Sequence, residues 1–212
     1  MDIREEIEKF DGLIDEETAR LLLMEKNFLI ERKKIKEATG NVALDAKIES
    51  IGKGALVIGD ESGHCILKLW GENKKILEYL REGDCIRIVN GFVREGIYGL
   101  EINVGKFGSI SIINKKIETK IDFGERNGIF CIKGKIEKKF PTKLFIENNY
   151  ERFSKKIIVD GKEIYLFDEI VKDANRISDG EEIVLLWVYK RSDKIHATSF
   201  SRIILKQHFE SH

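Results

Sequence analysis

The sequence is poor in several residues that mark particular classes of protein. It has one proline, Pro141, and three cysteines, Cys65, Cys85 and Cys131, which lie far apart and form no CxxC pair. An odd number of cysteines without metal-ligand spacing predicts buried thiols in a reducing compartment rather than disulfides or a zinc site. We therefore expect a cytoplasmic location, and no metal or other cofactor.

Long apolar runs and catalytic motifs are also missing. No stretch of about 18 apolar residues occurs, and Asp2–Lys9 is charged, so neither a membrane span nor a signal peptide is expected. The four histidines follow no Ser-His-Asp order, and neither HExxH nor GxxxxGK[ST] is present. The sequence therefore predicts a protein that is not an enzyme and does not enter a membrane.

The chain has no excess of charge of either sign, since 37 Lys and Arg residues balance 37 Asp and Glu residues. Zero net charge counts against nucleic-acid binding, because phosphate recognition usually leaves a basic footprint. The charges are uneven, however. Residues 113–212 carry 20 basic against 16 acidic residues, whereas residues 1–112 carry 17 against 21. The second part of the chain is therefore the more basic.

Three segments can be separated along the chain. Residues 1–40 contain two expected helices, at 4–10 and 15–26, and Asp15 stands where it can cap the second. Residues 28–40 are either an extension of that helix or a linker. The polar stretch 110–128 is interrupted by glycines and predicts a junction, with one domain at 41–112 and another at 113–212.

The segment 41–105 is the most regular part of the sequence. Asp60-Glu-Ser-Gly63 predicts a tight turn, and residues 64–70 then alternate apolar and polar as a half-buried strand does. A short helix at 71–80 and strands at 84–93 and 99–105 follow. Three strands, a helix and two strands are the order of a five-stranded Greek-key barrel of the OB type, which binds oligonucleotides or oligosaccharides on one open face.

The second part of the chain repeats this order. We expect strands at 129–138 and 142–147, a turn at Asp160-Gly161 within 155–167, a helix at 168–177, and a hairpin formed by 182–189 and 195–205. The predicted fold class is therefore mainly β, with a small helical N-terminal segment and two OB-fold five-stranded Greek-key barrels in tandem.

The strand that ends at Trp70 carries the first candidate site. Leu67 and Leu69 share one face, and Lys68 and Trp70 share the other. If the leucines fill the barrel, the lysine and the indole stand together outside it. An indole can stack on a base while a neighbouring ammonium meets a phosphate, which suits single-stranded nucleic acid. Taken singly, however, a tryptophan is more often a core residue and a lysine is usually solvated surface.

The positions of four further residues predict that they belong to the same interface. Arg87 alternates with two isoleucines and would extend the cationic track, and Arg94 and Tyr98 lie in the expected loop between the last two strands. Lys53, in the Gly-Lys-Gly loop between the first two strands, would form the opposite side of the groove.

In the second barrel the candidates are Lys133 and Lys135 on its first strand, Trp187 and Tyr189 on its fourth and Phe200 on its fifth. We expect Ile183, Leu185, Trp187 and Tyr189 to share one face of the fourth strand. The other face carries Val184, Leu186 and Val188, so both faces are apolar. Trp187 is therefore as readily explained by packing against a helix or another subunit.

Several short motifs resemble one family. These are Asp60-Glu-Ser-Gly63, Leu69-Trp70-Gly71-Glu72, Gly83-Asp84, Asn90-Gly91, Val93-Arg94 and the leading segment Gly12–Ala19. Together they resemble the OB domains of archaeal replication protein A, a single-stranded DNA-binding protein. The resemblance covers about residues 1–110 and implies that Trp70 and Tyr98 stack on bases. Residues 113–212 lack these motifs, and no zinc-ligand cluster stands near the C-terminus.

The resemblance implies a protein that holds and protects single-stranded DNA during replication, recombination and repair. Two alternatives remain open. One is an OB-fold subunit that acts mainly through contacts with other OB-fold subunits or with replication and repair proteins. The other is RNA binding, because stacking and phosphate contacts do not distinguish the two sugars.

Overall fold

The computed structural model describes residues 3–26, 31–52, 54–125 and 128–206. The chain divides into two compact units, residues 1–120 and residues 121–212. The boundary predicted from sequence lay after residue 112. Residues 113–120 instead continue along the first unit, where Lys115 and Thr119 bond to the side chains of Asp45 and Glu49. No helix in the described part of the chain is long and apolar enough to cross a membrane.

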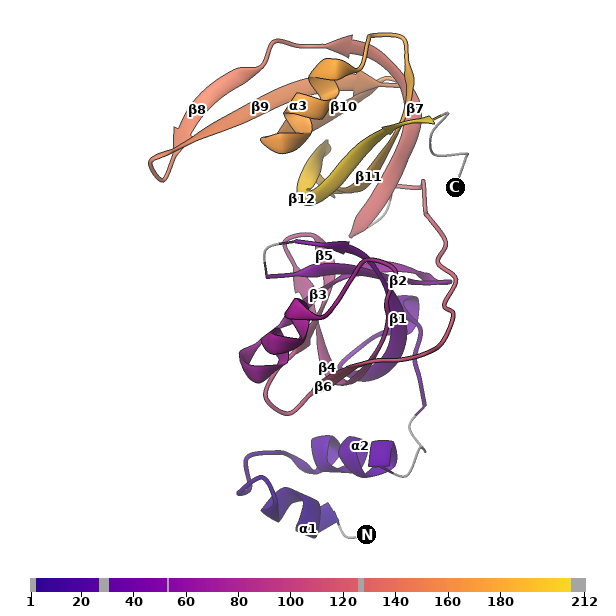
Figure 1. The fold of residues 1–212 in the computed structure, drawn as a ribbon, viewed down its shortest axis with the longest axis vertical. Coiled ribbons are helices and arrows are strands. Elements are labelled where there is room, and N and C mark those ends of the chain that lie inside the picture. The colour runs from indigo at the N-terminus through magenta and orange to yellow at the C-terminus, as the bar shows by residue number, and fades with distance from the viewer. Residues whose placement is uncertain (1–2, 27–30, 53, 126–127, 207–212) are drawn as a thin grey trace. The chain divides into compact units, whose positions relative to one another are not determined.

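The first unit contains a closed five-stranded barrel (Figure 1). Its elements are α1 (Ile3–Glu8), α2 (Glu16–Lys26), η1 (Ile35–Glu37), β1 (Asn41–Ile51), β2 (Leu56–Asp60), β3 (Gly63–Leu69), η2 (Gly71–Glu78), β4 (Cys85–Gly96), β5 (Gly99–Val104) and β6 (Ser109–Ile112). β1 pairs with both β2 and β4, β2 pairs with β3, β3 runs parallel to β5, and β5 pairs with β4. With η2 between the third and fourth strands, this is the OB topology.

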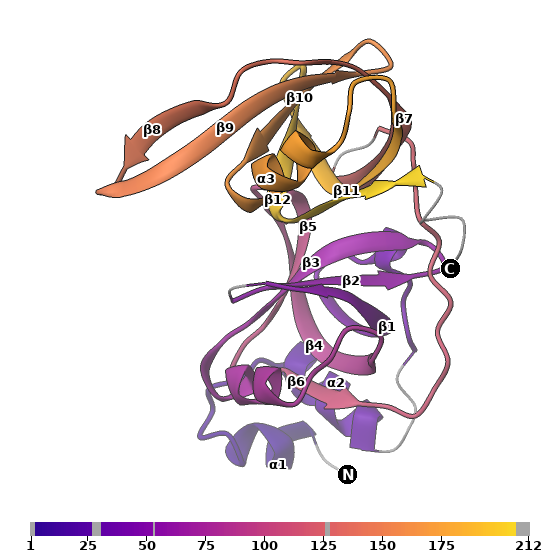
Figure 2. The same cartoon turned by 45° about the horizontal axis from the view of Figure 1, so that its top comes forward.

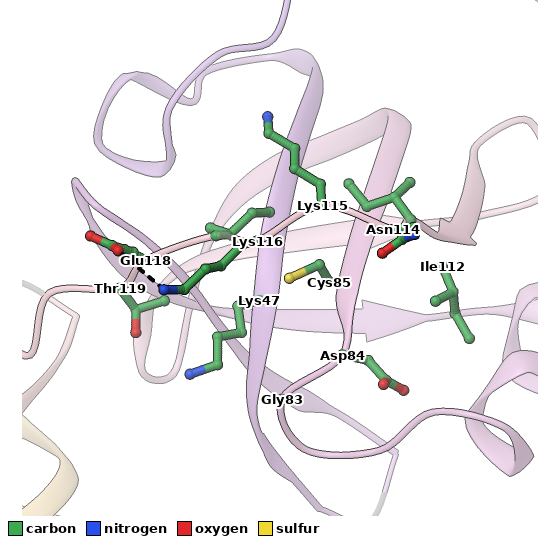
Figure 3. A pocket seen from close by; sticks show the side chains of 12 residues that line it. Lys47, Gly83, Asp84, Cys85, Ile112, Asn114, Lys115, Lys116, Glu118 and Thr119 are labelled. Atoms are coloured by element: carbon green, nitrogen blue, oxygen red, sulfur yellow. Dashed lines mark ion pairs between the residues drawn. The ribbon is translucent and has the colours of Figure 1, made fainter. Parts of the chain in front are cut away.

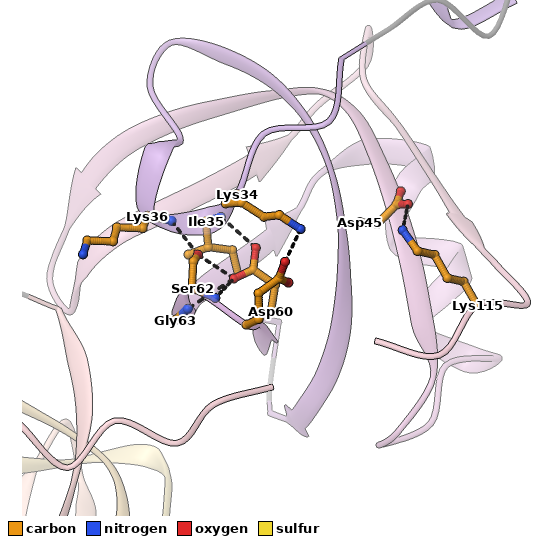
Figure 4. A network of polar contacts seen from close by, with 9 residues as sticks. Lys34, Ile35, Lys36, Asp45, Asp60, Ser62, Gly63 and Lys115 are labelled. Atoms are coloured by element: carbon orange, nitrogen blue, oxygen red, sulfur yellow. Dashed lines mark hydrogen bonds and ion pairs between the residues drawn. The ribbon is translucent and has the colours of Figure 1, made fainter. Parts of the chain in front are cut away.

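The Asp-x-Ser-Gly turn attaches the preceding segment to the barrel (Figure 4). One oxygen of the Asp60 carboxylate accepts hydrogen bonds from the backbone and hydroxyl of Ser62, and the other accepts one from the backbone N–H of Ile35 at 2.9 Å. Asp60 is buried, and a buried carboxylate needs such donors. The sequence left open whether this segment extends the helix or forms a linker. Residues 31–40 form a linker that is held against the barrel.

The N-terminal helices pack on this barrel rather than standing apart. Asp15 caps α2 by accepting the backbone N–H of Thr18 at 2.7 Å, as predicted, and this hydrogen bond lowers the pKa of Asp15. Leu21 and Met24 pack against buried Ala43 and Val89 of the barrel. Helices and barrel therefore form one unit.

The second unit also closes into a ring of five strands. Its elements are β7 (Ile129–Lys139), β8 (Lys143–Glu147), β9 (Tyr150–Val159), β10 (Lys162–Phe167), α3 (Glu169–Arg176), β11 (Glu182–Arg191) and β12 (Lys194–Leu205). The ring runs β7, β9, β10, β12, β11 and back to β7, with β10 and β12 parallel. Along the chain, α3 lies between β10 and β11, the third and fourth strands of the ring in sequence order. The prediction of two OB barrels is therefore confirmed.

One predicted strand takes another place. Residues 142–147 were expected to form the second strand of the second barrel, but that strand is β9. β8 pairs with the first part of β9 instead and forms an arm that projects from the unit (Figure 2). All five residues of β8 are exposed. A strand that joins the ring would have to bury one face, and β8 buries neither.

The face pattern of β11 also differs from the expectation. Ile183, Leu185, Trp187 and Tyr189 were expected to share one face, but a register shift between Leu186 and Val188 breaks the alternation. Trp187 has a positive φ of 58°, and Val188 joins the barrel core instead. The bulge therefore changes which side chains face outward beyond it.

Candidate nucleic-acid interface

The outer face of β3, β5 and the second half of β4 carries exposed aromatic side chains. Leu67 and Leu69 fill the core, so Trp70 stands outside, 48% exposed. Its Nε1–H donates to Oδ1 of Asn103 at 2.9 Å, which holds the indole plane in place. Asn103 is the cross-strand neighbour of Phe92, which is 54% exposed. Two aromatic rings thus flank one amide on the face that the alternation predicted.

The two cations that sequence predicted for this face, Lys68 and Arg94, are already engaged with a carboxylate. Lys68 Nζ lies 2.9 Å from both oxygens of Glu101, and Arg94 Nη2 lies 3.3 Å from one of them. The Glu101 side chain is only 1% exposed. The Glu101 side chain fits there because Gly96 has no side chain. A Cβ at position 96 would lie 1.9 Å from the Glu101 carboxyl carbon. Lys68 and Arg94 therefore share one compensating charge.

The predictions for Arg94, Tyr98, Lys53 and Arg87 have different outcomes. Arg94 is a strand residue rather than a loop residue, because the turn between β4 and β5 is only Ile97-Tyr98, where Tyr98 is half-buried. Lys53 lies outside the described residues. Arg87 bonds to Asp45 of β1 at 2.9 and 3.1 Å, and thus belongs to a different cluster from Trp70.

Asp45 is the centre of that second cluster. Lys115 also approaches its carboxylate, at 3.2 Å (Figure 4). Arg32 lies 3.6 Å from the same carboxylate. Burial opposes ionisation of Asp45, but the hydrogen bonds from Arg87 and Lys115 outweigh it and lower the pKa of this carboxyl group. These cations attach residues 113–120 and the linker to β1, so their first role is structural.

Two hollows beside residues 113–120 suit a stacked base poorly. One, of about 690 Å³, is lined by Lys47, Asp84, Cys85 and residues 112–119 (Figure 3), and the other, of about 390 Å³, lies over Asp45. Neither lining contains an aromatic side chain, and acidic residues accompany the lysines in both. Without a flat ring, such a surface lacks the stacking part of single-strand recognition.

The corresponding face of the second barrel carries a cluster of rings around His196. Tyr165 lies directly opposite His196 on the parallel strand and stacks on it, with ring centroids 5.3 Å apart and planes at 22°. Phe167 stacks at 6.2 Å and 4°, and Tyr189 tilts toward the imidazole at 5.6 Å. All four side chains are half-buried. Burial, reinforced by Arg191 and Lys194, lowers the pKa of His196, so the imidazole is neutral near pH 7.

Lysines of β9, β12 and β7 extend this cluster. Lys156 pairs with Tyr165 across the strands, and its ammonium lies 4.2 Å above the ring of Phe140. Lys194 lies over Tyr165 at 5.3 Å, and Lys138 over Phe140 at 4.9 Å. A hollow of about 340 Å³ opens between Phe140 and Tyr165. This surface combines flat rings with ammonium groups, as single-strand binding requires.

The candidates that sequence offered in the second barrel lie elsewhere, with one exception. Lys133 and Lys135 are exposed, but Lys135 pairs with Glu182 at the end of the β7–β11 ladder remote from Tyr189. Trp187 and Phe200 are buried, at 2% and 5% exposure. The Trp187 carbonyl accepts hydrogen bonds from the hydroxyls of Thr198 and Ser201. Only Tyr189 of this set joins the ring cluster.

Sequence reasoning missed Phe92, Phe140, Tyr165, Phe167 and His196. For Phe92 a signal was available, because it stands two residues before Arg94 on the same strand and therefore on the same face. Tyr165 and Phe167 also alternate with buried Ile164 and Leu166. Their gathering around His196 depends on a parallel pairing between strands some thirty residues apart, which no local pattern predicts.

Among the residues that the structure describes, no group of three or more His, Cys, Asp or Glu side chains is placed so that it could hold a metal ion. No protein-family model matches the sequence, and no curated protein is significantly similar to it.

Some solved structures are similar in part. A chain of a replication protein A heterotrimer bound to ssDNA is 12% identical with a TM-score of 0.43, over 82% of this chain and 51% of the other. This chain therefore spans about half the length of that one. The OB domain of Ta0387 from Thermoplasma acidophilum is 22% identical with a TM-score of 0.34, over 42% of this chain and 92% of that domain.

Schizosaccharomyces pombe Pot1pC bound to ssDNA is 14% identical with a TM-score of 0.36, over 41% of this chain and 88% of the other. Similarities with TM-scores this low carry no argument about this chain. The assignment of the OB fold therefore rests on the strand pairing of the two barrels.

Proposed function

We propose that this protein binds single-stranded DNA through the β3–β5 face of the first barrel and the β10–β12 face of the second. The observation that carries the proposal is the ring cluster of Tyr165, Phe167, Tyr189 and His196, flanked by lysines. Each stacked base contributes about 1–3 kcal/mol, and the ammonium groups supply the phosphate contacts. On the first barrel Trp70 and Phe92 serve the same purpose.

The finer role that we propose is that of replication protein A: holding and protecting exposed strands in replication, recombination and repair, in the cytoplasm and without chemistry of its own. The motif resemblance in residues 1–110 supports this role. Because the chain has no net charge, the proposal relies on stacked rings and a few local cations rather than on a large basic surface.

The test is an anisotropy titration with labelled oligo-dT, comparing the wild type with Trp70→Ala and Tyr165→Ala. Loss of one stacked base weakens binding about tenfold to hundredfold. Tyr79→Ala is the matched control, because Tyr79 is 69% exposed at the end of η2 remote from Trp70 and its loss leaves affinity unchanged. Wild-type affinity in both site variants would overturn the proposal.

Competition with duplex DNA and with RNA of the same sequence identifies the polymer. The proposal requires preference for single strands and for deoxyribose, since contacts with the 2′-hydroxyl are what select RNA. Binding must also weaken with salt, with a log–log slope of about −0.7 per phosphate contacted. Equal affinity for RNA would replace the DNA role with RNA binding.

The second candidate function is that of an OB-fold subunit which acts mainly through protein contacts. The exposed apolar side chains of the β8–β9 arm favour it, because monomers rarely leave such side chains clustered on their surface. Absence of oligonucleotide binding at low salt, together with co-purification of another OB-fold protein, would support this alternative.

A further inference from the structure

The arm formed by β8 and β9 ends in an open strand edge. Among the described strands, β8 pairs with β9 on one side and is the last strand of its sheet. An edge of this kind presents unpaired backbone N–H and C=O groups to any strand that can approach it. Proteins commonly block such edges with proline or with central charged residues. In β8 the three central residues are Leu144, Phe145 and Ile146.

The two faces of β8 differ in chemistry. Leu144 and Ile146 share one face with Phe153 of β9, and these side chains are 57%, 75% and 37% exposed. The other face presents Lys143, Phe145 and Glu147 in that order. The first face is thus an apolar row, and the second is a ring between two opposite charges.

The sequence Lys-Leu-Phe-Ile-Glu is complementary to itself when two copies run antiparallel. With a two-fold axis at Phe145, Lys143 of each copy lies opposite Glu147 of the other, and Leu144 lies opposite Ile146. Opposite charges and paired apolar side chains both stabilise neighbouring strands. From this complementarity we propose that β8 pairs with β8 of a second copy of this chain, forming an isologous dimer with a sheet continuous through both arms.

The proposed contact is small, so the association is weak. Five residues a side fall below the size of a standard interface, about 800 Å² per partner, and belong with transient contacts. We expect a dissociation constant in the range from about 1 µM to about 1 mM, where assembly follows concentration. On a single strand that carries several copies, the contact would gain from high local concentration.

Charge reversal gives a direct test. Lys143→Glu places like charges opposite each other twice in the dimer, and Glu147→Lys does the same with the other sign. Each variant alone is expected to shift the monomer–dimer midpoint in sedimentation equilibrium at least tenfold toward monomer. An equimolar mixture of the two restores dimers, because both cross-pairs are then complementary again. Rescue by mixing is the result expected when residue 143 of one copy lies opposite residue 147 of the other.

Two controls protect this interpretation. Glu151→Lys reverses a charge on the same arm but on β9, away from the edge, and is expected to leave the midpoint unchanged. Far-ultraviolet circular dichroism checks that each variant folds. Arg152 retains its 2.6 Å contact with Asp168 when Glu147 is replaced, so the arm keeps one of its ion pairs.

A cysteine at the axis supplies an independent readout. Phe145→Cys puts two thiols on facing backbones about 4.5–5.5 Å apart, within the range a disulfide spans. In a Cys85→Ser background, where Cys65 and Cys131 are buried, mild oxidation is expected to give a covalent dimer through position 145. A wild-type chain that remains monomeric up to about 1 mM, or one whose dimers ignore both charge reversals, would refute the proposal.

Discussion

Replacing Glu101 by glutamine is expected to strengthen the binding of single-stranded DNA. The direction of this change in affinity distinguishes a face that binds DNA from an ion cluster with only a structural role. Glu101 is buried and holds both Lys68, at 2.9 Å, and Arg94, at 3.3 Å. Glutamine keeps the size of the side chain and removes its charge. If these two cations face phosphates in the complex, the carboxylate between them opposes binding and its removal favours it.

The magnitude follows from the geometry. Two positive charges and one negative charge leave the cluster with a net charge of one, and the substitution raises it to two. Removing a negative charge about 7 Å from a phosphate changes the interaction energy by about 1 kcal/mol, for a dielectric between those of protein surface and water. Affinity at low salt therefore rises about fivefold. The log–log salt slope steepens by about 0.7 if one more phosphate is neutralised.

Anisotropy titrations of Glu101→Gln with oligo-dT at several salt concentrations measure both quantities. Glu169→Gln is the control for overall charge, because Glu169 also pairs with a lysine but is 85% exposed on α3. Its effect is expected to be negligible. Urea denaturation accompanies the titrations, since the loss of charge-assisted bonds to a buried group costs about 1–3 kcal/mol of stability.

Unchanged or weaker binding by a folded Glu101→Gln protein would refute this reasoning. It would mean that Lys68 and Arg94 serve only to compensate a buried carboxylate, and that the strand passes elsewhere. The rings of the second barrel would then have to account for all stacking.

Other predictions concern the architecture that supports the two faces. Gly96→Ala lowers the free energy of unfolding by about 1–3 kcal/mol, because its Cβ would meet the Glu101 carboxyl group. Adding Glu101→Ala to the same chain relieves most of that loss. Asp60→Asn sets an amide donor against the N–H of Ile35. The free energy of unfolding measured in urea is expected to fall by about 1–3 kcal/mol, and hydrogen exchange at Ile35 to become faster. Exchange at the wild-type rate would contradict the anchoring role. Because burial lowers the pKa of His196, the native state takes up its proton less readily than the unfolded chain. Stability is therefore full above about pH 6.5 and falls as the pH drops below it. His196→Gln flattens this part of the urea-midpoint profile, and an unchanged profile would show that another group titrates.

Local sequence patterns predicted most of the secondary structure and one face of the first barrel. The alternation through residues 64–70 placed Leu67 and Leu69 inside and Trp70 outside, because side chains in a strand alternate with a period of two whatever their partners are. The helix between the third and fourth strands of each set predicted the two OB barrels. The order of elements along the chain can be read from the sequence without knowing which strands pair.

Only the tertiary structure decided which side chains meet. Glu101 lies next to Lys68 because β3 and β5 run parallel at one particular register, and Tyr165 meets His196 for the same reason. The bulge at Trp187 changed the alternation in β11, so that Val188 rather than Trp187 follows Leu185 into the barrel core. Trp187, which sequence offered as a stacking candidate, is nevertheless buried. The sequence by itself thus determined the strands and the inward residues. Registers, bulges and the free edge of β8 depend on pairing between distant segments, which local periodicity does not contain.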